Sequence, residues 1–248
     1  MDFAAIPKET LHRWTLSSGS TVSVERIRIP DFLAAFAQLP TPVLQIGSKA
    51  SVIDGDTGSG AKWRRLFGRG PFIGADLEPG ENVDAILDVT KDIKKFRKAA
   101  GIFQYRTVIC AHVLEHVEDP FAAARNIASL TDKGGHVLVT TPWVQSYHAF
   151  PEDYWRFSFA GLRKLFPGME IAGGFYSDAR EETGYWIAID DRPDFTKDAL
   201  RLEGNLFQFL LDDLPRQDMF QDAFDGDKIA LSRLYMPAMS VNLVFRKA

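Results

Sequence analysis

The sequence lacks several features that would place it in a specialised class of protein. Its single cysteine, Cys110, cannot form a disulfide within the chain, which favours a reducing compartment. No uncharged apolar stretch approaches the ~20 residues that cross a bilayer. The charged residues near the N-terminus leave no apolar segment for a secretory signal. We therefore expect a cytoplasmic protein without a membrane span.

A surplus of positive charge is missing as well. The formal net charge is −4, whereas proteins that bind nucleic acid usually carry basic residues that neutralise phosphates. The basic patch of Lys62, Arg64 and Arg65 is local and does not change this balance, so we expect no nucleic-acid partner. Hydrophobic residues make up 46% and charged residues 25% of the chain, proportions that are typical of a globular domain.

Residues 1–40 are interpreted as an N-terminal extension. Apolar and polar residues alternate from Thr21 to Glu25 after a turn at residues 17–20, a pattern that predicts a β-hairpin. Apolar residues between Phe32 and Leu39 share one helical face, and Pro40 ends that helix. We expect the extension to pack on the core or over its ligand cleft.

Short apolar strands and helices alternate from Val43 onward. This alternation implies parallel strands with right-handed crossovers, and so predicts an α/β fold with a doubly wound, mostly parallel sheet. The main domain covers residues 41–248, with its core at residues 42–172. The expected strands are residues 43–46, 72–75, 85–87, 107–110 and 136–140, and the expected helices are residues 61–67, 92–100 and 120–130.

The pattern loosens after residue 150. It predicts a helix at residues 159–166, a strand at residues 186–189 and a closing strand at about residues 239–246. Residues 191–237 are acidic and rich in Phe and Leu, and we expect them to form a helical insertion over one end of the sheet. The Phe-rich part, residues 206–224, could be a lid or an interface between copies of the chain. The second alternative would make the protein a homo-oligomer.

Three of the expected strands end in residues suited to a ligand. Gly47, Asp76 and Asp88 follow the first three strands, at the sheet edge where doubly wound folds bind ligands. Gly47 lets the backbone approach a ligand, Asp76 can accept hydrogen bonds from ribose hydroxyls, and Asp88 can meet an adenine. Gly and Asp are also common in turns, but their presence at successive strand ends favours a nucleoside site.

These motifs resemble those of class I S-adenosylmethionine-dependent methyltransferases. Residues 43–47 (VLQIG), 74–77 (GADL) and 87–89 (LDV) are similar to the first three cofactor motifs of that family, and residues 108–117 (VICAHVLEHV) to the fourth-strand motif of its type 11 branch. The resemblance implies a Rossmann-like methyltransferase fold over residues 41–248, S-adenosylmethionine as cofactor, and methyl transfer to a small-molecule or glycan-like acceptor. The cofactor-binding residues that it implies are Gly47, Ser48, Asp76, Leu77, Asp88, Val89, Ala111 and His112.

The first of these motifs departs from the family pattern. Gln45 replaces the usual acidic residue, and residues 48–50 (SKA) stand where further glycines are expected. The resemblance implies that this loop holds the amino-acid end of the cofactor, and Lys49 could either pair with the cofactor carboxylate or fill its space. The alternative function is therefore a catalytically inactive, methyltransferase-like binding or assembly protein.

The candidate catalytic residues are His112, His148, Asp153 and Tyr154. Methyl transfer from a sulfonium is an in-line displacement, and a general base is needed only when the acceptor must lose a proton. His112 follows the fourth strand and should face the cleft.

The aromatic stretch at residues 148–157 (HAFPEDYWRF) follows the fifth strand. Its residues could line an acceptor pocket, or the aromatic side chains could form a hydrophobic plug held by an Asp153–Arg156 salt bridge. His116 is interpreted as a capping or supporting residue. The pair His112 and His116 lacks an evident third ligand, so we expect no metal site.

Overall fold

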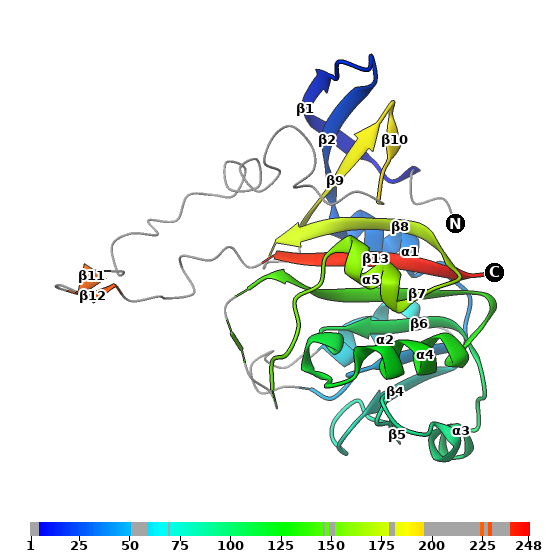
Figure 1. Ribbon diagram of the computed structural model, residues 1–248. Helices are drawn as coiled ribbons and strands as arrows, with labels where there is room; N and C mark the ends of the chain where they lie inside the picture. Colours follow the sequence, from blue (N-terminus) through cyan, green and yellow to red (C-terminus); the bar gives the residue numbers. More distant parts are fainter. Residues whose placement is uncertain are drawn as a thin grey trace.

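A computed structural model describes residues 5–50, 59–68, 70–145, 147–148, 152–178, 182–195, 224–225, 228–229 and 239–248. Its main feature is an 11-stranded sheet in the order β1-β2-β9-β8-β13-β7-β6-β3-β4-β5, with β10 paired to β9 (Figure 1). The strands are β1 (Lys8–Thr15), β2 (Thr21–Arg28), β3 (Val43–Ile46), β4 (Phe72–Asp76), β5 (Ala85–Ile86), β6 (Tyr105–Ala111), β7 (Thr131–Val144), β8 (Met169–Asp178), β9 (Thr183–Ile189), β10 (Arg192–Pro193) and β13 (Met239–Lys247).

One half of the sheet is parallel and contains the topological switch point. Strand β3 pairs in parallel with both β4 and β6, β4 pairs with β5, and β6 pairs with β7. The chain therefore runs outward from β3 to β5 on one side, returns, and runs outward again from β6 to β7 on the other side. The order reverses between β3 and β6, where doubly wound sheets bind ligands. This arrangement confirms the predicted α/β fold.

The other half of the sheet is antiparallel. Strand β13 lies between β7 and β8 and is antiparallel to both. Strand β9 then pairs with β8 and with β2 of the N-terminal hairpin. The predicted hairpin is confirmed by β1 and β2, and it continues the sheet at the edge farthest from β5. Strand β8 was not predicted.

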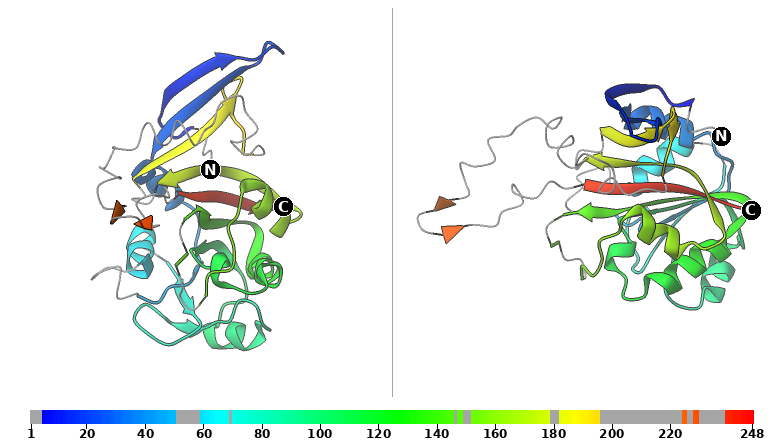
Figure 2. Two further views of the ribbon diagram at one scale, coloured as in Figure 1. Left: turned by 60° about the vertical axis from the view of Figure 1, so that its left-hand side comes forward. Right: turned by 45° about the horizontal axis from the view of Figure 1, so that its top comes forward.

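Helices cover both faces of the sheet, as Figure 2 shows from two directions. Residues on β6 alternate between the two cores: Val108 and Cys110 pack with one group of helices, and Ile109 packs with the other. The first face carries α3 (Lys94–Ala100), α4 (Pro120–Leu130) and α5 (Phe159–Leu165), and the second face carries α1 (Ile29–Phe36) and α2 (Ser59–Phe67).

Side-chain caps fix the two helices that flank the candidate site. The Asp119 carboxylate accepts a hydrogen bond from the backbone N–H of Ala122 at the start of α4, where Pro120 is the first helical residue. Ser158 accepts one from the backbone N–H of Gly161 at the start of α5. Each cap contributes about 1 kcal/mol to its helix. The cap of α5 also sets where the preceding segment, residues 152–157, enters the helix.

The observed elements differ from the predicted ones in length. Strand β5 ends at Ile86, and β7 extends over 14 residues to Val144. Within residues 191–237 the structure describes β10 and the short strands β11 (Phe224–Asp225) and β12 (Lys228–Ile229). The helices predicted for this stretch would fall on residues outside the described ones. In the part of the chain that is described, no helix has the length and apolar character needed to cross a membrane.

Candidate active site

Gly47 ends β3 at the switch point, in a conformation that needs glycine. Its φ is +75°, and a Cβ atom there would lie 2.5 Å from Cγ2 of Val113. Its N–H donates to the carbonyl of Ala75 at 2.9 Å, which keeps the loop against the end of β4. The neighbouring Ser48 is buried, and its hydroxyl donates to the carbonyl of Asn82.

Asp76 is held in place by the loop that follows β3. Its Oδ2 atom accepts a hydrogen bond from the backbone N–H of Lys49 at 3.0 Å, and among the described residues Oδ1 has no hydrogen-bond partner. The Lys49 ammonium is directed to Glu78 at 2.7 Å. The hydrogen bond with Glu78 raises the pKa of Lys49 and lowers that of Glu78. The substituted first loop therefore supports Asp76 through its backbone, while its lysine side chain pairs with a neighbouring acid.

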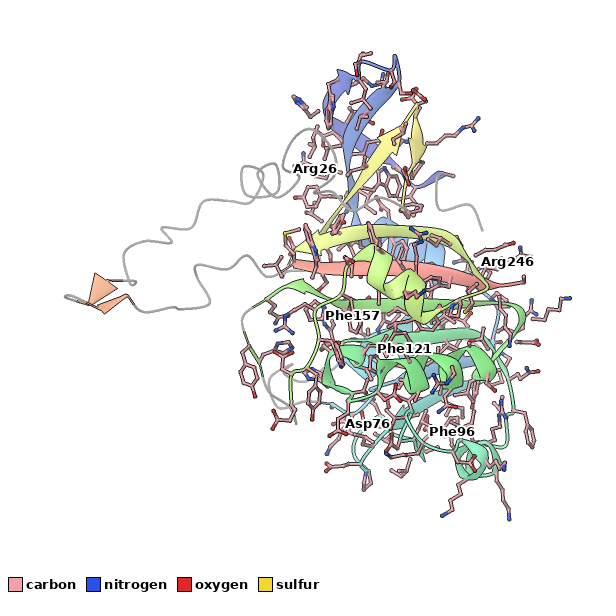
Figure 3. The ribbon with its side chains drawn as sticks, viewed as in Figure 1. Arg26, Asp76, Phe96, Phe121, Phe157 and Arg246 are labelled. Carbon is pink, nitrogen blue, oxygen red and sulfur yellow. The ribbon has the colours of Figure 1, made fainter. Side chains whose placement is uncertain are left out.

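Asp88 lies at the same edge as Asp76. The N–H of Leu87 donates to the carbonyl of Asp76 at 2.8 Å, so the two segments run together as they leave the sheet. Oδ1 of Asp88 accepts from the backbone N–H and the hydroxyl of Thr90. Figure 3 shows Asp76 well separated from Arg246, which lies near the amino ends of the parallel strands. The predicted pair of carboxylates thus shares the carboxyl edge of the sheet.

The other residues predicted to bind cofactor differ in exposure. Leu77 is 55% exposed, as is the apolar Ile86 at 50%, so two apolar side chains flank the carboxylates. Val89 is buried in the core, and Ala111 at the end of β6 is half-buried.

His112 begins the turn after β6 in a left-handed conformation. Its φ is +55°, and its N–H donates to the carbonyl of Thr140 at 2.9 Å. Nδ1 of the ring lies 3.3 Å from Oε1 of Glu115, and the side chain is 39% exposed. Glu115 is fully buried, and its Oε2 atom has no hydrogen-bond partner among the described residues. The site therefore contains a buried carboxylate that no sequence pattern marks as a site residue.

The segment after β7 folds back on the short helix η3 (Leu114–His116). The carbonyl of Glu115 accepts from the N–H groups of Tyr154 and Trp155 at 2.8 and 3.3 Å. Nδ1 of His116 lies 2.6 Å from the carbonyl of Glu152, and the ring centroids of His116 and His148 are 5.1 Å apart. These contacts bring both histidines to the same buried carboxylate.

Asp153 anchors this segment through an ion pair. Its carboxylate is 1% exposed and accepts two hydrogen bonds from Arg156, at 2.5 and 2.7 Å, and one from the backbone N–H of His148 at 2.8 Å. The Arg156 hydrogen bonds, opposed by burial, lower the pKa of Asp153 to about 2. A carboxylate of such low pKa is a poor proton acceptor at neutral pH. The geometry gives Asp153 a role in holding His148 in place.

The aromatic residues of the segment separate into two groups. Tyr147, Tyr154 and Trp155 are 65%, 44% and 40% exposed, whereas Phe157 is buried in the core and its ring contacts that of Trp155. Partial burial, and then the charges of neighbouring glutamates, raise the pKa of Tyr154, so its hydroxyl stays protonated at neutral pH. The exposed rings lie on the same segment of the chain as His148.

A family model for a methyltransferase domain matches residues 26–175, which is more than half of the chain. The chain belongs to the methyltransferase domain family. Over 65 residues the chain is 38% identical to a ubiquinone biosynthesis O-methyltransferase of Marinobacter nauticus, and the match covers 26% of each protein. The chain therefore matches only about a quarter of the length of this curated relative.

Solved methyltransferase structures resemble the methyltransferase domain at low identity. An S-adenosylmethionine-dependent methyltransferase from Archaeoglobus fulgidus aligns with 13% identity and a TM-score of 0.48, over 88% of this chain and 91% of that one. An N-methyltransferase from Bradyrhizobium japonicum, in complex with S-adenosylhomocysteine, aligns with 14% identity and a TM-score of 0.40, over 62% of this chain and 80% of that one. Similarity at this level carries no functional information.

Proposed function

We propose that the domain is an active enzyme that transfers a methyl group from S-adenosylmethionine to an oxygen of a small-molecule or glycan-like acceptor. The observation that carries this proposal is the pair of carboxylates at the switch-point edge. Asp76 and Asp88 each use one oxygen in a hydrogen bond to the protein, and the other has no partner among the described residues. Two such acceptors on adjacent strands suit the hydroxyl and amino groups of a nucleoside.

Asp76 would accept hydrogen bonds from the ribose, and Asp88 would meet the base. The exposed apolar side chains of Leu77 and Ile86 lie beside the two carboxylates. An adenine ring could pack against both of these apolar side chains. The Lys49 N–H holds the Asp76 carboxylate before any ligand arrives, and such preorganisation reduces the cost of binding.

His112 is the group that we assign as proton acceptor. When bound, S-adenosylmethionine supplies a methyl group on a positively charged sulfur, and an acceptor hydroxyl becomes a good nucleophile only on losing its proton. His112 lies at the switch point, is partly exposed, and contacts the buried Glu115 carboxylate. That carboxylate stabilises the positive charge that the imidazole gains with the proton.

The proposed acceptor class follows from the rings near His148. Tyr147, Tyr154 and Trp155 are partly exposed, and the Trp155 N–H and the Tyr147 hydroxyl donate to the Val117 carbonyl and to Glu152. What the rings offer a ligand is therefore their apolar faces, against which a flat ring can stack. The name of the relative from Marinobacter nauticus includes O-methyltransferase, which agrees with an oxygen acceptor.

Isothermal titration calorimetry with S-adenosylmethionine and S-adenosylhomocysteine tests the cofactor site. Replacing Asp76→Asn should weaken binding about 10- to 100-fold, because a hydrogen bond to a charged group is worth roughly 1.5–3 kcal/mol. Asp191→Asn is the matched control: Asp191 is exposed and pairs with Arg13 on the hairpin, so its replacement should leave affinity unchanged.

The inactive binding protein remains the competing function, because the first loop departs from the family pattern. A folded sample that binds neither S-adenosylmethionine nor S-adenosylhomocysteine would support it and contradict the enzyme. If the cofactor binds, a radiolabelled methyl group offered with catechol-like and sugar acceptors should be transferred to one of them. Replacing His112→Ala should then reduce the rate more than it changes cofactor affinity.

A further inference from the structure

Three ligand-type side chains from two separate segments meet beside the active site. Glu115 and His116 belong to η3, and His148 comes from the segment after β7. One potential ligand atom from each lies within 4.8 Å of the other two. No third ligand is evident in the sequence because His148 is 32 residues from His116, and only the tertiary fold brings them together.

The buried carboxylate of this group is incompletely satisfied. Glu115 is fully buried, and Oε2 has no hydrogen-bond partner in the described part of the chain. Burial of an unpaired charged oxygen is costly, and native proteins rarely leave such an atom unsatisfied. Nδ1 of His148 is also buried; it lies 3.2 Å from Oδ2 of Asp153 but lacks the alignment of a hydrogen bond. The Glu115 carboxylate therefore suits a further positive partner.

The surroundings orient His116 in the way that metal-binding histidines are oriented. Nδ1 of His116 lies 2.6 Å from the Glu152 carbonyl, which can only accept, so Nδ1 carries the proton. In the neutral ring Nε2 is then the atom that can bind a cation, and it lies 3.9 Å from Oε1 of Glu115. A ligating histidine usually donates its other N–H to a carbonyl or carboxylate, and the Glu152 carbonyl takes this role.

We propose that Glu115, His116 and His148 bind a divalent transition-metal cation of the Zn²⁺ type. Two imidazoles and one carboxylate are a ligand set that Zn²⁺ uses in catalytic sites and that related transition metals also accept. Mg²⁺ and Ca²⁺ prefer sites built from oxygen, so this site should discriminate against them. Three protein ligands leave a coordination position for another molecule.

If the acceptor hydroxyl occupies that open position, the cation takes part in the proposed methyl transfer. A hydroxyl oxygen bound to Zn²⁺ has a much lower pKa than a free one, so the acceptor would lose its proton more easily beside His112. This last step rests on the proposed function, whereas binding of the cation itself does not.

Calorimetry on protein stripped with EDTA and dialysed tests the site directly. Titration with ZnCl₂ should show one ion bound per chain, and MgCl₂ under the same conditions should bind far more weakly. His116→Ala and His148→Ala should each weaken Zn²⁺ binding at least tenfold. The control is His12→Ala, because His12 is exposed on β1 of the hairpin, and its removal should leave Zn²⁺ binding unchanged. Absence of Zn²⁺ binding, or binding that survives both active-site replacements, would overturn the proposal.

Titration of the same samples with S-adenosylhomocysteine separates this proposal from the proposed function. Variants that still bind S-adenosylhomocysteine are folded, so a loss of Zn²⁺ binding in them reports on the ligands. If the parent protein binds S-adenosylhomocysteine but not Zn²⁺, the cation site is wrong and the methyltransferase function stands. If it binds Zn²⁺ but neither S-adenosylmethionine nor S-adenosylhomocysteine, the cation site stands and the methyltransferase function is wrong.

Discussion

Replacing Gly47→Ala should destabilise the protein by two separable effects. Alanine at a φ of +75° places Cβ against the following carbonyl, which costs about 1–2 kcal/mol. The new Cβ would also lie 2.5 Å from Cγ2 of Val113, well inside the ~3.5–4.0 Å at which two carbon atoms attract. Because Val113 packs against the main core, it cannot move away freely, and overpacking of this kind costs typically 1–3 kcal/mol.

A double-mutant cycle with Val113→Ala distinguishes the two effects. Removing Cγ2 takes away the collision but not the backbone strain, so Gly47→Ala should cost only about 1–2 kcal/mol in the Val113→Ala background. The cycle should therefore show a favourable coupling of roughly 1–3 kcal/mol. Free energies of unfolding come from urea titrations followed by tryptophan fluorescence.

The matched control for this cycle is Gly101→Ala. Gly101 has a φ of +68°, and a Cβ atom there would meet nothing within 4 Å. Gly101→Ala should therefore lower the free energy of unfolding only by the backbone contribution, about 1–2 kcal/mol, whether residue 113 is valine or alanine. Equal costs at Gly47 and Gly101, or a cost at Gly47 that Val113→Ala does not reduce, would refute the close approach at the switch point.

Further measurements test groups elsewhere in the chain. Asp153→Asn should lower stability by ~2 kcal/mol at pH 7, because it leaves Arg156 without its partner. The folded-state pKa of Asp153 is depressed to about 2, so its contribution is present above the unfolded value of 3.8 and lost as pH falls toward 2; the difference from the parent should shrink over that range in urea titrations. Burial raises the pKa of the Cys110 thiol, so a thiol reagent should label it only after unfolding, and labelling of the native protein would contradict that burial. Glu25→Gln should cost about 1–3 kcal/mol in urea, since Glu25 is buried and accepts a 2.6 Å hydrogen bond from Trp186; an unchanged midpoint would show that these contacts contribute nothing.

Much of the parallel half of the sheet could be predicted from local sequence. Buried strands read as short apolar runs, and the glycine and aspartates that end them mark the carboxyl edge. Helix α4 was predicted with its observed bounds, because Asp119 and Pro120 form a recognisable start. Strand β8 was missed: it carries Gly173 and Gly174 in mid-strand, residues that usually argue against a strand.

The pairing of distant segments could not be read from the sequence. Strand β2 joins β9 across about 160 residues, and nothing local in either strand specifies that partner. The same holds for the candidate site. The motif at residues 112–116 marked His112 and His116, but the burial of Glu115 depends on residues 152–157 folding over it through the Tyr154 N–H.

The position of β13 has a consequence for how the protein is made. Strand β13 follows every other described strand in the chain, yet it supplies the hydrogen bonds that join β7 to β8. A nascent chain lacking it could assemble the parallel strands that lead to Asp76 and Asp88, but their outermost strand, β7, would present an unpaired row of amides and carbonyls. Such exposed rows recruit other chains. Synthesis of β13 therefore both completes the sheet and covers this exposed row.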